Sequence, residues 1–382
     1  MSTRVSSFAA GWCTRFRRRP PPMTPWTVVN DETAEKHGAP GWVKASLVAL
    51  LAVLVLGTGA VLLPPAEGPE PEPPFSETAR AAAYEDTVTL AAEAARAGSP
   101  AATVTLLETQ ARALLAPDPT ATAPSSGTAT PASKSTFLSG LSRSAAQRLA
   151  DAGKSDGGPA RLLAAVGTAQ HLESVRLAKA WSLPVPATPL PSAAASVPAA
   201  PTPEPSCTAA AGAVSPSAAS PAASSQGPAA AATTADALAA VVGAEQKAVY
   251  LYQVALTRLE GASAAAAASD LEQHQLLLRE AEALARQQCA KVPPREAGYQ
   301  LPAGFASQAQ ATLAEQETAA LPAYGELVAL SDGATRRWAM AGLFDSARRL
   351  EAMGSPPGAL PGLSVDPAAL PPLPQASASP LP

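Results

Sequence analysis

The residues best placed for chemistry are a repeated pair of a glutamate and a tyrosine, seven positions apart, in the C-terminal half of the chain. Glu245 precedes Tyr252 in one segment, and Glu317 precedes Tyr324 in another. Both pairs fall on the three- and four-residue spacing that apolar side chains follow along the buried face of a helix. A third segment places His274 on the same kind of face. We therefore expect these side chains inside a helical bundle, with the hydroxyls of Tyr252 and Tyr324 near Glu317 and Glu245.

Carboxylates on two helices and a histidine on a third are the ligands of carboxylate-bridged di-iron sites, because Fe(III) prefers carboxylate and imidazole. The usual Glu-x-x-His spacing is missing, since Leu271 stands three positions before the histidine. Iron or manganese binding is therefore the alternative hypothesis, and we expect no cofactor. The candidate metal ligands are Glu245, Asp270, Glu272, His274 and Glu317, with Asp345 as a further carboxylate.

The fourth segment offers an arginine where a symmetric metal site would have a second histidine. Its apolar positions Met340, Leu343 and Ala347, continued upstream at the same spacing, lead to Arg336. A cation there would compete with metal ions for the carboxylates. Three interpretations stay open: a working metal site, a buried Glu/Tyr/His network with Arg336 left from a lost site, and a partly solvated helix face.

A four-helix bundle is needed to bring these side chains together. The block at 234–353 divides into helical segments at 235–260, 264–289, 306–331 and 333–353. The first and last breaks are short enough to force antiparallel neighbours. The middle connection at 291–305 is long enough to run the length of a helix, which permits the long crossover of ferritin-like bundles without requiring it.

A resemblance to a known family rests on four stretches of this block, ALAAVVGAEQKAVYLYQVALTRLEG, LEQHQLLLREAEALARQQCAKVPPREAGYQLP, AEQETAALPAYGELVAL and RRWAMAGLFDSARRLEAMG. They resemble an actinobacterial family of ferritin-like domains of unknown function, whose members are typically the outer part of membrane-anchored or secreted proteins. The resemblance covers about 120 of the 382 residues. It implies an all-α fold with a ferritin-like four-helix bundle and no established activity. Because the second ligand motif of metal-binding relatives is missing, their ferroxidase chemistry is not carried over.

A further helical block is predicted at 77–182. Its helical runs are Glu77–Ala97, Ala101–Leu115, Lys134–Ala152 and Pro159–Trp181. Gln170 and His171 stand before Arg176 at the spacing that Gln273 and His274 have before Arg279. A second, diverged bundle of the same kind and a chance match in alanine-rich helices are both open interpretations.

A membrane anchor is predicted near the N-terminus. Residues 45–63 carry no charge over nineteen positions, about the length of a bilayer-spanning helix. The basic tail at 1–44 then lies in the cytoplasm and the rest outside, by the positive-inside rule. A cleaved signal peptide and translation from Met23 are the alternatives left open.

The remaining segments are rich in proline. A stiff Pro/Glu spacer is predicted at 64–76, a disordered Pro/Ala/Ser linker at 183–232 and a disordered Pro-rich tail at 354–382, because such compositions bury too little apolar surface to offset the entropy of ordering. Cys207 of the linker and Cys289 would both lie on the oxidising side, so they are candidates for a disulfide.

Composition and missing motifs limit the function. The formal net charge of −4 gives no general basis for nucleic-acid binding. Phosphate-binding loops, nucleophile elbows, His-Glu-x-x-His and Cys-x-x-Cys do not occur in the sequence. The sequence favours a single-pass, non-enzymatic module of the cell envelope that binds an unidentified protein or envelope component. The alternative is a ferritin-like metal-dependent oxidoreductase or metal-storage protein, and a homodimer is compatible with either.

Overall fold

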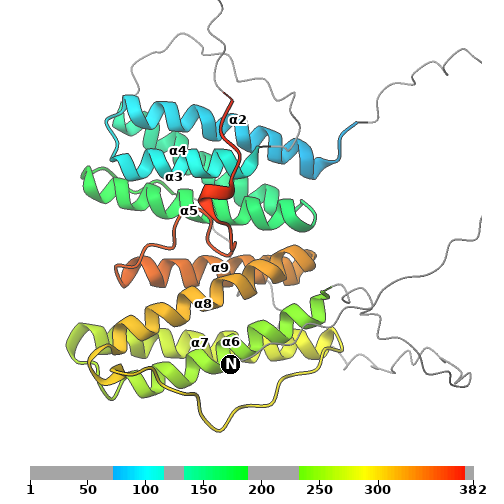
Figure 1. The fold of residues 1–382 in the computed structure, drawn as a ribbon, viewed down its shortest axis with the longest axis vertical. Helices are drawn as coiled ribbons and strands as arrows, with labels where there is room; N and C mark the ends of the chain where they lie inside the picture. Colours follow the sequence, from blue (N-terminus) through cyan, green and yellow to red (C-terminus); the bar gives the residue numbers. More distant parts are fainter. Residues whose placement is uncertain (1–71, 116–132, 188–231, 375–382) are drawn as a thin grey trace, which may run out of the picture. The chain divides into compact units, whose positions relative to one another are not determined.

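The computed structural model describes residues 72–115, 133–187 and 232–374. Eight α-helices and no strands lie in these residues (Figure 1), so the described part of the chain is all-α, as predicted. None of the helices in these ranges is both long and apolar enough to cross a membrane. The predicted anchor at 45–63, the tail at 1–44 and most of the linker lie outside the described residues.

The first bundle consists of helices close to the predicted runs. They are α2 (Phe75–Arg96), α3 (Ala101–Leu114), α4 (Lys134–Ala152) and α5 (Gly157–Ala180). Pro100 precedes α3, where its missing N–H costs no helical hydrogen bond. The side chain of Ser133 caps α4 by accepting from the backbone N–H of Thr136 at 3.1 Å. One end of the bundle closes around Leu107, Phe137 and other buried apolar side chains.

The second bundle has the predicted order of two hairpins. Its helices are α6 (Thr234–Ala255), α7 (Gly261–Gln287), α8 (Ala309–Leu330) and α9 (Gly333–Ala352). Thr233 and Asp236 form a capping box that fixes the start of α6. Gly261 and Gly333 begin α7 and α9 with φ of +57° and +50°, a backbone region that glycine adopts without a steric penalty. Each glycine lets the chain reverse direction in a short turn.

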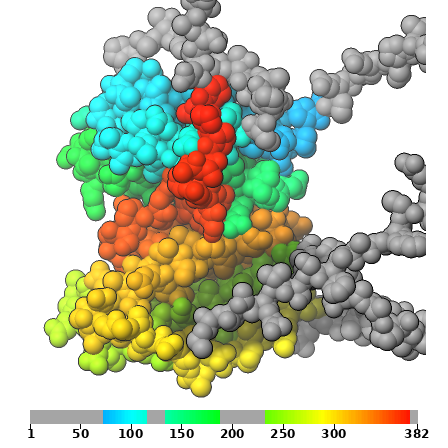
Figure 2. Space-filling view, viewed as in Figure 1, coloured from blue at the N-terminus to red at the C-terminus, as the bar shows by residue number. Residues whose placement is uncertain are grey.

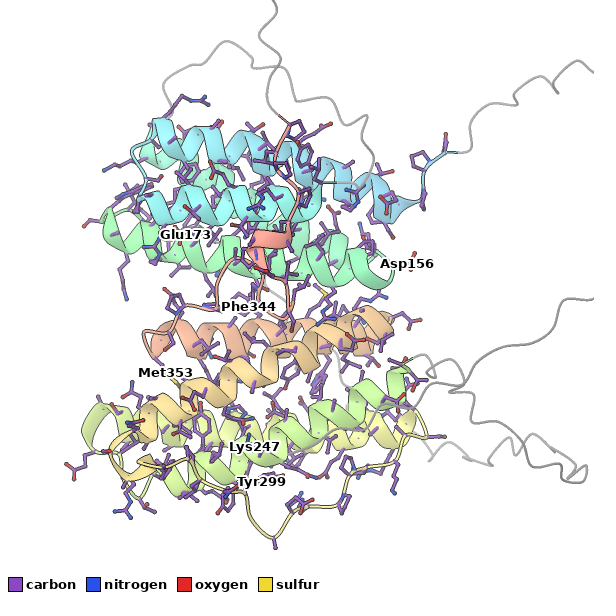
Figure 3. The ribbon with its side chains drawn as sticks, viewed as in Figure 1. Asp156, Glu173, Lys247, Tyr299, Phe344 and Met353 are labelled. Atoms are coloured by element: carbon purple, nitrogen blue, oxygen red, sulfur yellow. The ribbon has the colours of Figure 1, made fainter. Side chains whose placement is uncertain are left out.

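The connection between α7 and α8 runs along the bundle. Tyr252 contacts Glu317 and Tyr324 contacts Glu245, which makes α6 and α8 antiparallel. Since α7 turns back from α6, α7 and α8 are parallel and residues 288–308 must span the bundle's length (Figure 1). The ring of Tyr299 in this crossover (Figure 3) packs on Tyr250 of α6, with centroids 5.5 Å apart. The long crossover that the sequence permits is therefore present.

The two bundles pack on each other through α5, which contacts α8 and α9 (Figure 1). They belong to one compact unit beginning at Glu72. Leu163 of α5 and Leu343 of α9 are fully buried in a single apolar cluster. Phe344 of α9 (Figure 3) meets the ring of His171 of α5 at a centroid distance of 5.3 Å. As a result, α9 is buried on two opposite sides.

Arg336 belongs to this contact between the bundles, which corrects its predicted place in the Glu/Tyr/His network. Its Nε donates to the backbone carbonyl of Val328 at 3.1 Å, and its Nη1 donates to the carbonyl of Ser155 in the first bundle. The prediction placed Arg336 on the wrong face of α9 because this helix is buried on both sides. Apolar spacing in such a helix does not reveal which face meets the carboxylates.

The C-terminal segment differs from the predicted disordered tail as far as residue 374. Figure 2 shows it, in red, lying across the first bundle. Gln110 donates to the carbonyl of Ala359 at 3.0 Å, and Arg112 donates to the carbonyl of Pro371 at 2.9 Å. Arg161 reaches the carbonyl of Gly362 with two donors, at 3.0 and 2.6 Å. Proline-rich chain lacks N–H donors but keeps its carbonyls, so side chains of the bundles can hold it in place.

Replacing Arg336 tests whether the contact between the bundles contributes to stability. We expect Arg336→Met to lower the free energy of unfolding by about 1 to 3 kcal/mol, because two buried carbonyls lose their donors. The measurement is urea-induced unfolding followed by circular dichroism. Arg337→Met is the matched control, since Arg337 is exposed one position further along α9. Equal midpoints for the two variants would contradict this role of Arg336.

Candidate functional site

Two glutamate–tyrosine pairs form the centre of the second bundle. Glu245 and Tyr252 project from α6, and Glu317 and Tyr324 project from α8; all four side chains are fully buried. The hydroxyl of Tyr252 donates to Glu317 and that of Tyr324 donates to Glu245, each at 2.8 Å. The seven-residue spacing on two antiparallel helices produces this reciprocal arrangement. Both tyrosine hydroxyls lie where the sequence predicts them.

His274 of α7 bridges the two carboxylates. Its Nδ1 lies 2.8 Å from Glu245 and its Nε2 lies 2.7 Å from Glu317, and the side chain is 1% exposed. Ionised carboxylates only accept hydrogen bonds, so both ring nitrogens donate when the two glutamates are charged. Burial opposes the charged imidazole, but Glu245 and Glu317 outweigh it and raise the pKa of His274 to about 9.

Arg349 and Ser346 of α9 complete the network, and sequence reasoning missed both. The Nε of Arg349 lies 3.1 Å from Glu317, and the hydroxyl of Ser346 donates to the same carboxylate at 2.7 Å. Arg349 is 1% exposed. Burial raises the pKa of Glu317, but Arg349 and His274 outweigh that effect and lower it to about 2. The two buried negative charges are thus balanced by two buried positive charges.

The tyrosines complete the network as neutral donors. Burial and the neighbouring Glu317 raise the pKa of Tyr252 well above its usual value. Burial and the neighbouring Glu245 do the same for Tyr324. Both phenols therefore keep their protons throughout the pH range in which His274 titrates. Each glutamate receives a hydroxyl donor in addition to the imidazole.

A glycine makes room for one of these tyrosines. A Cβ atom at Gly342 of α9 would lie 2.1 Å from Cε1 of Tyr324, so no larger residue fits there without displacement of the ring. Gly342, Ser346 and Arg349 follow one another at four- and three-residue spacing on one face of α9. A glycine in mid-helix next to two polar residues at that spacing is the signal that could have identified this face.

The other predicted carboxylates lie apart from the hydrogen-bonded network. Glu272 is exposed on α7, and Asp345 forms a surface ion pair with Arg348 at 3.6 Å. Asp270 is half-buried and shares a pocket of about 230 Å³ with Arg349. Burial raises the pKa of Asp270. Of the predicted ligands, the structure joins Glu245, His274 and Glu317 directly.

Within the described ranges, no group of three or more His, Cys, Asp or Glu side chains is arranged to hold a metal ion. The chemistry of the donors agrees with this. Both nitrogens of His274 face carboxylates, and Arg349 lies against Glu317 where a metal ion would compete with it. The residues present do not fit a bound metal in this arrangement.

Cys289 takes part in a disulfide bond. Its predicted partner, Cys207, lies outside the described residues, so the pairing of these two cysteines stays a prediction.

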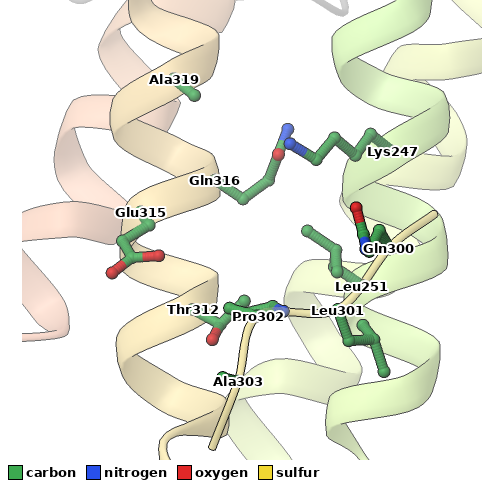
Figure 4. Close-up of a pocket in the computed structure, with 10 residues that line it drawn as sticks. All are labelled: Lys247, Leu251, Gln300, Leu301, Pro302, Ala303, Thr312, Glu315, Gln316 and Ala319. Carbon is green, nitrogen blue, oxygen red and sulfur yellow. The ribbon is translucent and has the colours of Figure 1, made fainter. Parts of the chain in front are cut away.

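A second cavity lies outside the network, between α6, α8 and the crossover. Its volume is about 530 Å³ (Figure 4). Lys247 of α6 and Gln316 of α8 reach into it from opposite walls, and Leu301 of the crossover lines it. Gln316 is 4% exposed and donates to the carbonyl of Ala244 at 3.1 Å. This cavity shares no lining residue with the glutamate–histidine network.

The first bundle does not repeat the network. His171 faces α9, and burial lowers its pKa. Gln170 next to it donates to Gln110 at 3.1 Å, while Glu173 (Figure 3) pairs with Arg176 of its own helix at 2.8 Å. The matched spacing of the Gln-His pairs therefore produces two different environments.

A family model described as "Domain of unknown function (DUF4439)" matches residues 237–365. The matched range is about a third of the chain and covers the second bundle and the start of the C-terminal segment. It agrees with the resemblance to a domain of unknown function at this position. No curated protein and no solved structure matches the chain.

The charge on His274 predicts how stability depends on pH. Its pKa is raised from 6.5 to about 9 in the folded chain, so its contribution is fully present below pH 6.5 and lost as the pH rises through 9. We expect the free energy of unfolding to fall over that window by on the order of 3 kcal/mol. Chemical unfolding at a series of pH values measures it.

The controls for this pH dependence are two histidine variants. His274→Gln removes the titrating group, so the free energy of unfolding should no longer fall as the pH rises from 6.5 through 9. His171→Gln keeps the decline, because burial lowers the pKa of His171 and its effect on stability appears at acid pH instead. A decline of equal size in His274→Gln would show that another group causes it.

The close approach of Gly342 to Tyr324 gives a second prediction. Gly342→Ala should destabilise the chain by about 1 to 3 kcal/mol, because the new methyl group meets an aromatic ring that is itself buried and hydrogen-bonded. Gly243→Ala is the matched control: a Cβ atom at Gly243 of α6 meets nothing within 4 Å, and we expect stabilisation by about 1 kcal/mol or less. Thermal unfolding of both variants compares the two, and a stable Gly342→Ala variant would contradict the packing described.

Proposed function

We propose that the chain is a membrane-anchored module of the cell envelope, with a ferritin-like second bundle that serves binding or structure and not catalysis. The single observation that carries the non-catalytic part of this proposal is the internal charge balance of the network. Glu245 and Glu317 are already paired with His274 and Arg349. The carboxylates that a di-metal centre would use as ligands are already paired with the protein's own cations.

The hydrogen bonds and ion pairs of His274 and Arg349 support a structural role for these two residues. A metal ion bound to His274 would need a lone pair on a nitrogen that now faces a carboxylate. It would also have to compete with the guanidinium of Arg349, which is always protonated. If a metal ion replaced Arg349 as the partner of Glu317, the arginine would be buried without its counter-ion, at a cost of several kcal/mol.

The ferritin-like part of the proposal rests on topology and on the position of the carboxylates. Two antiparallel hairpins joined by a lengthwise crossover, with a glutamate on one helix of each hairpin and a histidine on α7, support this part of the proposal, although the Glu-x-x-His spacing of such bundles is missing. The predicted anchor at 45–63 and the proline-rich segments support a place at the outer face of a membrane, from which the bundles would reach a partner.

Metal analysis of the full chain tests the proposal. We expect substoichiometric iron, manganese and zinc after expression with added metal and purification in detergent, with no difference between the unmodified chain and Glu245→Ala. Elemental analysis by mass spectrometry gives the metal content, and circular dichroism checks that both proteins are helical. Near-stoichiometric metal that is lost in Glu245→Ala would overturn the proposal and favour the metal-dependent oxidoreductase or storage function.

A further inference from the structure

The pocket beside Arg349 has features of a ligand site that the charge network does not explain. It lies between α7, α8 and the end of α9, near Met353 (Figure 3), with a volume of about 230 Å³. Most of its wall is apolar, with Ala262, Ala266 and Ala267 of α7 facing Leu313 of α8. Small-molecule sites typically combine such walls with a few well-placed polar groups.

Arg349, one of the polar residues that line this pocket, has an N–H donor without an acceptor within the described ranges. Arg349 lines the pocket and is 1% exposed, yet among the described residues its Nη1 has no hydrogen-bond partner. Its Nη2 donates to Ser346 at 3.3 Å, and its Nε lies 3.1 Å from Glu317 as an ion pair but, like Nη1, makes no hydrogen bond in the part of the chain that the structure describes. A buried guanidinium N–H without an acceptor costs free energy, so an acceptor supplied from the pocket would be stabilised there.

The chemistry of the walls and of the donor selects the ligand. A carboxylate makes the strongest hydrogen bond with a guanidinium, because both partners are charged. An ammonium group would be repelled by Arg349. The alanine and leucine walls favour a short aliphatic chain behind the carboxylate, since apolar area buried from water contributes about 25 cal/mol per Å².

We propose that the pocket between α7, α8 and α9 binds a short aliphatic carboxylate, whose oxygen accepts a hydrogen bond from Nη1 of Arg349 and whose chain packs on the alanines of α7. Asp270 lines the same pocket and opposes the ligand's charge, which limits the affinity. The inference does not depend on the proposed envelope role, because it concerns a pocket beside the network and a ligand that is not a metal.

The experiment is a calorimetric titration of the full chain in detergent with butyrate, butyramide and butylamine as probes. We expect saturable binding of butyrate and much weaker binding of butyramide and of butylamine, because the ammonium is repelled by Arg349 although Asp270 attracts it. Equal binding of butyrate and butyramide would overturn the requirement for a carboxylate. An absence of saturable binding up to on the order of 10 mM butyrate would overturn the site itself.

Substitutions that leave every hydrogen-bonded residue of the charge network in place assign the binding to this pocket. Ala266→Leu narrows the pocket and should weaken butyrate binding about tenfold or more, whereas Ala265→Leu, one position earlier on α7 and outside the pocket lining, should leave it unchanged. Asp270→Asn removes the opposing charge and should tighten binding roughly twofold to fivefold. Unchanged affinity in Ala266→Leu, or weaker binding in Asp270→Asn, would overturn the proposal.

Discussion

Two negative charges buried at the centre of the second bundle are the constraint on which its construction depends. A carboxylate removed from water is costly unless charged and hydrogen-bonded partners replace the solvent. Here each of α7, α8 and α9 supplies a partner for Glu245 or Glu317. The four helices are therefore tied together by groups that cannot be left unpaired, in a core whose other side chains are chiefly alanines and leucines.

This dependence bears on specificity as much as on stability. Alanine-rich helices can slide or rotate against one another at little cost, because their surfaces are smooth and similar along their length. A hydrogen-bonded charge network has one acceptable register, since a shift of one position would leave a charge without its partner. We interpret the network as the feature that selects the helix pairing, a role that buried polar groups have in some other helical assemblies.

Sequence reasoning found the part of the site that follows simple periodicity. The face of α6 that carries Glu245 and Tyr252, and its counterpart on α8, could be identified because apolar residues mark one side of each helix. Arg349 could not be found in this way. One side of α9 packs in its own bundle and the opposite side packs on the first bundle, so apolar residues do not mark a single face of the helix. The order of the C-terminal segment was missed for a similar reason. Its composition gives it no core of its own, and what holds it in place belongs to residues more than 200 positions earlier in the chain.

The way in which the bundles hold the C-terminal segment has a consequence for how that segment tolerates change. Gln110, Arg112 and Arg161 recognise its main-chain oxygens and not its side chains. Any residue type offers such an oxygen, so these hydrogen bonds by themselves place no limit on the residue types of the segment. Gly362 is limited in another way: its φ is +84°, and a Cβ atom there would stand 2.8 Å from Cδ1 of Leu343. Gly354 and Gly358 of the same segment also have positive φ, a conformation that favours glycine. We therefore expect the sequence of this segment to vary most at its exposed positions, and least at these glycines and at Leu360 and Leu373, which pack against the core.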